Sequence, residues 1–166
     1  AGEDYTLSAR LDRPATFTPD TGLFVLGRLE ELDERDYRTR SASLGVGVSH
    51  FFSDRLSGEL GVTLRYSEVR DDLGRRTLDQ LLVPASLTWD GRDDPLDATR
   101  GLYLAVEATP FLGLDGGASG ARLYADARAY RGLGGGGRFV LAGRVQAGSV
   151  FDASVTDVPP DMLFFS

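Results

Sequence analysis

One stretch decides the fold: Leu56-Ser57-Gly58-Glu59-Leu60-Gly61-Val62-Thr63-Leu64-Arg65-Tyr66. Apolar side chains stand at nearly every second position, with polar residues or glycine between them. Because successive side chains of a β-strand point to opposite faces, this stretch predicts a strand with one apolar and one polar face. Such a strand needs an apolar environment on one side. Either a second sheet or a lipid bilayer supplies it, and the choice between the two decides what the protein does.

The same alternation recurs along nearly the whole chain and predicts about eight strands, near residues 4–17, 23–32, 36–51, 55–70, 76–90, 100–110, 120–131 and 138–150. Segments rich in Gly, Pro and Asp separate them, which is typical of turns. The predicted fold class is therefore all-β, an antiparallel up-and-down meander. The predicted strands have about 10–16 residues, whereas globular strands usually have about 5–6 and membrane-spanning strands about 9–11. Their length favours the bilayer.

Composition narrows the possible functions. The chain has 166 residues, a formal net charge of -7 and no Cys. Its acidity disfavours nucleic acid as a partner, and the lack of Cys excludes disulfides, thiolate catalysis and Cys-ligated zinc. No apolar run approaches the roughly 18 residues of a membrane-spanning helix, which excludes a helical membrane protein. The sequence has no recognisable nucleophile–base pair or cofactor loop, so we predict no catalytic residues, no enzymatic activity and no cofactor.

The polar faces of the predicted strands carry many charged side chains, which suits a water-filled or self-paired barrel lumen. Candidate lumen-facing residues are Glu59, Arg65, Glu107, Arg122, Asp126, Arg128 and Arg144. A soluble meander, β-sandwich or ligand-binding barrel stays open as an alternative, because a polar face can also be simply solvated.

The densest charge cluster is Trp89–Gly101, which holds the four aspartates Asp90, Asp93, Asp94 and Asp97. A calcium loop needs oxygen ligands at a regular spacing and usually a terminal Glu, and that spacing is absent. Arg92 and Arg100 also neutralise part of the negative charge. We therefore predict a charged turn between two strands and no metal site.

Three segments in the second half of the chain stand out together. They are the turn Asp90-Gly91-Arg92-Asp93-Asp94-Pro95 followed by Thr99-Arg100-Gly101, the strand 138–149 and the tail 158–166. In this order they resemble the barrel of the BamA/TamA outer-membrane assembly superfamily, also called the bacterial surface antigen type. The family-motif residues of the turn are Asp90, Arg92, Asp93, Arg100 and Gly101, and Ala98 stands where the family often has Pro. Two earlier segments, 11–14 and 49–56, are most similar to the TamA branch.

The resemblance implies that residues 1–166 are a partial outer-membrane β-barrel domain, an interior section of a sixteen-stranded transmembrane barrel. The POTRA domains, the first and last barrel strands and a Val-Arg-Gly-Tyr motif would then lie outside this chain. The turns near 18–21, 53–54, 91–98 and 132–137 would be periplasmic. Those near 33–35, 71–76 and 111–119 would be extracellular.

The resemblance further implies a non-enzymatic insertase in the outer membrane of a Gram-negative bacterium. Its partners would be outer-membrane lipid, client outer-membrane proteins such as autotransporter barrels, and a periplasm-spanning partner subunit. In the family, the arginine of the Val-Arg-Gly-Tyr motif docks on the inner barrel wall. Strand parity makes Glu59, Glu107 and Asp126 candidates for that wall.

Rival interpretations remain beside this one. They are the BamA branch, the related secretion-pore branch, a passive eight-stranded outer-membrane barrel and the soluble β-sandwich. An isolated half-barrel has exposed strand edges and an apolar outer face, so we expect it to self-associate in water.

Overall fold

The computed structural model describes residues 4–33, 37–71, 74–114, 119–133 and 139–151. Within these ranges the chain forms nine β-strands. They are β1 (Tyr5–Arg13), β2 (Thr21–Asp33), β3 (Tyr37–Ser53), β4 (Leu56–Asp71), β5 (Gly74–Leu82), β6 (Ala85–Asp90), β7 (Arg100–Gly113), β8 (Gly120–Leu133) and β9 (Phe139–Phe151). The described part of the chain contains no helix that is long and apolar enough to cross a membrane. The all-β prediction is confirmed.

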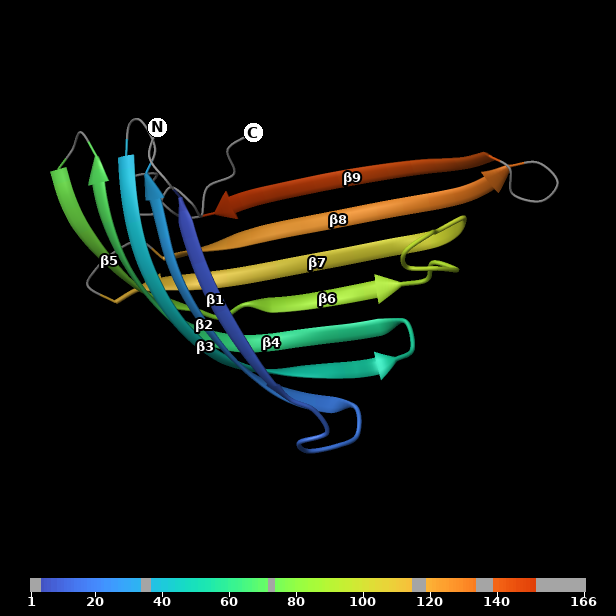
Figure 1. Ribbon diagram of the computed structural model, residues 1–166, viewed down its shortest axis with the longest axis horizontal. Coiled ribbons are helices and arrows are strands. Elements are labelled where there is room, and N and C mark those ends of the chain that lie inside the picture. Colours follow the sequence, from blue (N-terminus) through green and yellow to red (C-terminus); the bar gives the residue numbers. More distant parts are fainter. Residues whose placement is uncertain (1–3, 34–36, 72–73, 115–118, 134–138, 152–166) are drawn as a thin grey trace.

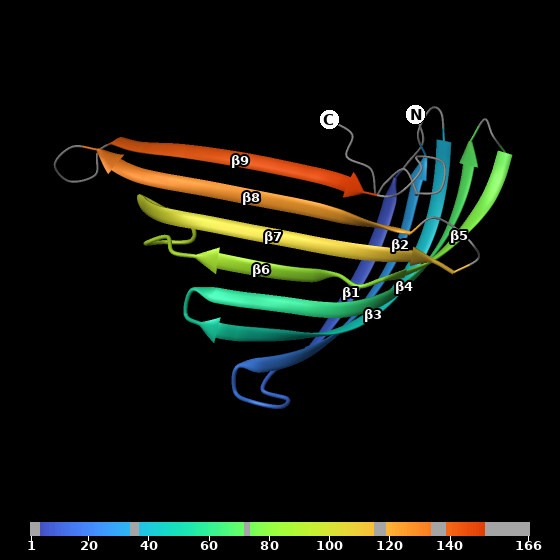
Figure 2. The same ribbon diagram turned by 180° about the vertical axis from the view of Figure 1, so that it is seen from behind.

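The strands pair antiparallel in a single sheet, in the order β1-β2-β3-β4-β5-β7-β8-β9, and β6 pairs with both β4 and β7. This is the predicted up-and-down meander. The sheet is strongly twisted and curved (Figure 1), and the view from behind shows the same curvature (Figure 2). Over the described residues β1 and β9 share no ladder, so they form the two edges of an open sheet.

The strand predicted near 76–90 is divided into β5 and β6. The division falls at Val83-Pro84, because proline has no N–H to donate to a ladder. Two hydrogen bonds carry the sheet past the break: the Gly61 N–H donates to the Pro84 carbonyl (2.8 Å), and the Val83 N–H donates to the Pro110 carbonyl (2.9 Å). The two halves occupy one place in the meander, which is why about eight predicted strands correspond to nine described ones.

The first predicted strand, near 4–17, ends earlier than expected. β1 stops at Arg13, and Ala15 in the following turn has a φ of 50°. A positive φ takes the backbone out of extended geometry, so the residues after Arg13 turn towards β2. Residues 134–137 of the turn predicted near 132–137, and the tail 158–166, lie outside the described residues, whereas residues 132 and 133 belong to β8.

The two faces of the sheet differ in an unusual way. One face, here called the apolar face, carries large hydrophobic side chains from one sheet edge to the other. Its members include Leu29, Val46, Val62, Leu64, Leu87, Trp89, Leu104, Val106, Leu123 and Val145, with exposed fractions of 42% to 69%. The buried hydrophobic residues lie on the opposite, polar face, and they are Phe24, Val69, Leu82, Ala105 and Phe111. A water-soluble sheet buries its apolar face, so the distribution here is inverted.

Candidate functional site

The polar face is the concave face of the sheet. Arg10 on β1 and Glu59 on β4 form an ion pair of 2.6 Å, although β2 and β3 lie between their strands. In a flat sheet two such strands would lie about 14 Å apart. The sheet therefore curls towards the polar face and encloses a charged trough.

Phe24 on β2 fills the floor of this trough beneath the ion pair. Its ring lies over glycines: a Cβ added to Gly47 on β3 would stand 2.4 Å from the ring, and one added to Gly61 on β4 would stand 3.6 Å from it. The Arg10 guanidinium lies over the ring, 4.2 Å from the centroid, as a cation–π contact. We call Arg10, Phe24 and Glu59 the β1–β4 clasp.

Sequence reasoning found Glu59 but missed Arg10 and Phe24. Arg10 stands near the start of the chain and Glu59 is 49 residues away, so strand alternation gives no sign of their contact. The available signal was the row of glycines Gly45, Gly47 and Gly61 on the polar face. Glycines that face a concave surface leave space that another side chain must fill.

A second charged group crosses β6, β7, β8 and β9. Asp126 on β8 is 4% exposed and accepts hydrogen bonds from Arg128 (2.6 Å) and from Arg144 on β9 (2.7 Å). The two arginines lie directly opposite each other in register, so the carboxylate relieves their repulsion. Three of the predicted lumen-facing residues are thus brought together in one cluster.

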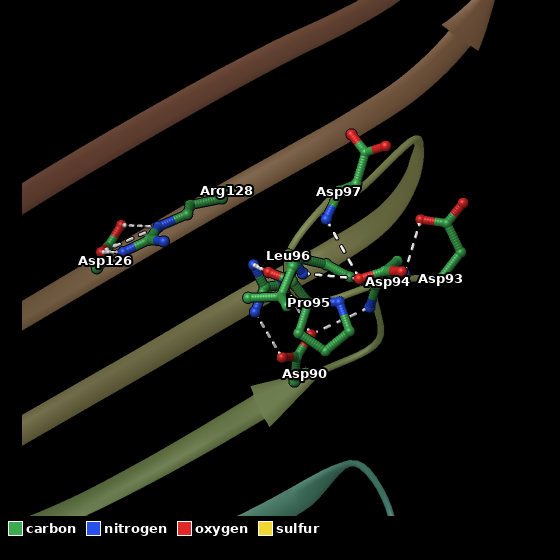
Figure 3. A network of polar contacts seen from close by, with 9 residues as sticks. Asp90, Asp93, Asp94, Pro95, Leu96, Asp97, Asp126 and Arg128 are labelled. Atoms are coloured by element: carbon green, nitrogen blue, oxygen red, sulfur yellow. Dashed lines mark hydrogen bonds and ion pairs between the residues drawn. The ribbon is translucent and has the colours of Figure 1, made fainter.

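Tyr103 on β7 extends this cluster towards the turn that follows β6. The guanidinium carbons of Arg128 and Arg92 lie 4.8 and 4.9 Å from the Tyr103 ring centroid. Arg92 is paired in turn with Asp90 at 2.7 Å. Figure 3 shows Asp126 and Arg128 on β8 and Asp90 at the end of β6, with β7 between them. The family-motif turn and the charged strand face form one connected network.

The other predicted lumen-facing residues also lie on the polar face. Arg65 on β4 stands 3.9 Å from Glu30 and donates to the Ser41 hydroxyl at 3.3 Å. Arg65 and Arg122 line a cavity of about 190 Å³. Glu107 on β7 is exposed and faces Tyr124 of β8 in register.

Asp93 organises the turn between β6 and β7. Its Oδ1 accepts hydrogen bonds from the N–H groups of Thr99 (3.0 Å) and Arg100 (2.9 Å), and the Thr99 hydroxyl donates to Oδ2. The Thr99 hydroxyl and then the Arg100 N–H hold the pKa of Asp93 well below its usual range. Asp94 acts similarly, because its Oδ1 accepts the N–H groups of Leu96 (2.8 Å) and Asp97 (3.2 Å; Figure 3).

Arg92 and Gly101 close the base of the turn. Arg92 donates to the Pro95 carbonyl at 3.0 Å, and the Asp90 carboxylate raises the pKa of Arg92. Gly101 has a φ of 112°, and a Cβ there would stand 2.3 Å from the Gly91 carbonyl oxygen, so only glycine fits. The carboxylates of Asp93 and Asp94 serve as caps for the turn's own backbone. Among the described residues no group of three or more His, Asp or Glu side chains is placed to hold a metal ion.

A single sheet of long strands, with an exposed apolar face and a concave face of paired charges, is the construction of a transmembrane β-barrel wall. The protein is thus of the outer-membrane β-barrel class. More particularly, the chain belongs to the Omp85 superfamily, because the Omp85 superfamily domain matches residues 3–166. Members of this superfamily are bacterial outer-membrane proteins of assembly and transport that work with client proteins and partner subunits. A comparison with curated proteins gave no match. The expected superfamily is confirmed.

Proposed function

We propose that this chain is a section of a larger outer-membrane barrel that inserts client β-barrel proteins, of the TamA type, without enzymatic chemistry. The observation that carries the proposal is the inverted burial of the sheet. Its apolar face is half exposed across every paired strand, while its small core and its ion pairs lie on the concave face. Lipid on the convex side and water on the concave side would satisfy both faces.

The open sheet supports a larger barrel over the rival interpretations. A closed eight-stranded barrel needs a ladder between its first and last strands, and β1 and β9 share none over the described residues. A sandwich needs a second layer over the apolar face, and the described strands belong to one sheet. Both edges instead stay available for further strands of the same barrel. On its own the chain would self-associate through these edges.

The energy for insertion would come from strand pairing and from burial of the client's apolar surface in lipid. An unpaired edge of such a barrel binds an incoming strand by β-augmentation, so the client is templated before it is released. No cofactor enters this scheme. Autotransporter barrels are the proposed clients, and a periplasm-spanning subunit is the proposed partner.

The inner wall has carboxylates for an arginine from elsewhere in the barrel. Glu59 and Asp126 already bind arginines of this chain. Glu107 makes no hydrogen bond or ion pair among the described residues, and it is exposed on the same face. Of the three candidate carboxylates, we therefore propose Glu107 as the first choice for binding the arginine of the Val-Arg-Gly-Tyr motif. Glu107→Gln in the full-length protein should slow client assembly, and unchanged assembly kinetics would remove Glu107 from this role.

The membrane placement can be tested with the single tryptophan of the chain. Trp89 lies on the apolar face and is 47% exposed. In vesicles with brominated acyl chains we expect strong quenching of its fluorescence. The matched control is the double variant Trp89→Phe/Thr88→Trp, which moves the indole to the opposite face of β6. Equal quenching in both proteins, or none in the first, would refute a lipid-facing apolar face.

A further inference from the structure

The apolar face changes character towards one end of β2 to β5, and the strand register shows the change in rows. One row is Gly27, Leu44, Leu64 and Leu81, and the next is Leu29, Ala42, Tyr66 and Asp79. The following row is Glu31, Arg40, Glu68 and Thr77, and the last is Asp33, Arg38, Arg70 and Arg75. Successive rows on one face are about 7 Å apart. Within a short distance the surface thus passes from an aliphatic row, through a mixed row that holds Tyr66 and Asp79, to two charged rows.

The last row places three arginines side by side. Arg38, Arg70 and Arg75 are direct cross-strand neighbours on β3, β4 and β5, and Arg40 stands one row below. Like charges directly opposite one another destabilise a sheet. We call these four side chains the arginine rim.

Carboxylates only partly compensate this charge. Glu31 accepts hydrogen bonds from Arg38 and pairs with Arg40 (3.1 Å), and Glu68 pairs with Arg70 (3.1 Å) and Arg75 (2.6 Å). With Asp33 beside Arg38 in register, the last two rows hold four guanidiniums and three carboxylates, and Asp79 stands in the row before them.

The exposure of the two kinds of charge differs. The arginine side chains are 45% to 61% exposed, whereas those of Glu31 and Glu68 are 26% and 15% exposed. Outward-facing groups are therefore mainly guanidiniums, held from beneath by carboxylates. A small hollow of about 20 Å³ lies between Arg38, Arg40, Glu68 and Arg70.

We propose that the arginine rim binds the phosphate-bearing headgroup of a membrane lipid whose acyl chains lie on the rows of Leu44, Leu64 and Tyr66. Guanidinium forks match phosphate oxygens in pairs, and a phosphate monoester offers about two negative charges and three acceptor oxygens to several arginines at once. Because the arginine rim lies next to exposed leucines, we expect it to bind a lipid in preference to a free anion. The inference rests on the proposed membrane function, in which the turns after β2 and β4 face the extracellular side. The occupant is then a phosphorylated lipid of the outer leaflet.

The test is native mass spectrometry of the full-length protein in detergent, titrated with lipid A as a bis-phosphorylated glycolipid. We compare the wild type with Arg38→Gln/Arg70→Gln/Arg75→Gln. The matched control is Arg13→Gln/Arg55→Gln/Arg131→Gln, which removes the same charge at exposed positions outside the rim. We expect the rim variant to bind lipid A about tenfold or more weakly, since charge-assisted hydrogen bonds are lost. The control variant should bind as the wild type does, and enzymatically dephosphorylated lipid A should bind the wild type as weakly as lipid A binds the rim variant.

Three results would overturn the inference: equal lipid A binding by wild type and rim variant, equal loss in the control variant, or competition by inorganic phosphate at the concentration of the lipid. Circular dichroism of each variant verifies that the sheet is intact. Quenching of Trp89 fluorescence is measured on the same proteins in vesicles with brominated acyl chains, as the difference between each protein and its Trp89→Phe variant. If Trp89 is quenched but lipid A and dephosphorylated lipid A bind equally, only the proposed role of the arginine rim is refuted. If Trp89 of the wild type is not quenched, the proposed function is refuted.

Discussion

Phe24→Ala removes the floor of the β1–β4 clasp, and its cost can be worked out from the structure. Phe24 is 9% exposed, its Cζ atom lies close to Gly47 and Gly61, and the Arg10 guanidinium lies over its ring. Burial of about 200 Å² at about 25 cal/mol per Å² corresponds to about 5 kcal/mol for the whole residue, of which alanine retains a part. Buried Phe→Ala changes cost about 3–5 kcal/mol, and the lost cation–π contact adds about 0.5–1 kcal/mol. Because the Arg10 side of the clasp is open to the trough, the cost should lie in the lower part of this range. We expect the free energy of unfolding to fall by about 3–4 kcal/mol.

The assay is urea unfolding of the protein in detergent, followed by circular dichroism. Phe17→Ala is the matched control, since Phe17 is 71% exposed in the turn between β1 and β2. Its cost should stay within about 0.5 kcal/mol. A loss below about 1 kcal/mol for Phe24→Ala would show that the clasp does not hold the curvature of the sheet.

Three further predictions concern the same face and the turn after β6. Gly47→Ala should destabilise the fold strongly in the same urea assay, because its Cβ would stand 2.4 Å from the Phe24 ring and 2.6 Å from a backbone carbonyl oxygen. The control Gly27→Ala should be neutral, because a Cβ at Gly27 meets nothing within 4 Å. Equal effects of the two variants would contradict the packing described. Asp126→Asn should lower the urea midpoint, because it leaves two facing arginines without a carboxylate; an unchanged midpoint would contradict that role. Asp93 has a lowered pKa in the folded protein, so its contribution to folding stability is present above the ordinary aspartate pKa of about 3.9 and is lost as the pH falls towards the folded value. Asp93→Asn should therefore flatten the decline of the urea midpoint between about pH 5 and pH 2. An unaltered pH profile would refute the capping role.

Alternation of side chains was a sufficient guide to the strands because it is a local property. Val62 and Leu64 on one face and Thr63 and Arg65 on the other follow from backbone geometry alone, and the structure keeps that division. The errors came where backbone chemistry interrupts the pattern. Pro84 divides one predicted strand, and the positive φ of Ala15 follows the early end of another.

The turn after β6 shows the limit of motif reasoning. The spacing of its aspartates argued against calcium, but it did not reveal what the carboxylates do. Only the folded turn brings Asp93 to the N–H groups of Thr99 and Arg100, and Asp94 to those of Leu96 and Asp97. These bonds depend on the path of the loop, which side-chain identity does not specify.

The all-β meander, the two faces of the strands and the residues on each face follow from the amino-acid sequence, because strand parity depends only on neighbouring positions. Which charged side chains form pairs depends on the folded sheet. Arg10 reaches Glu59 because glycines let the sheet curl around Phe24, and the arginine rim forms because the register of β3, β4 and β5 aligns three arginines. Curvature and register join residues that are distant along the chain, so they become visible only when the strands are paired.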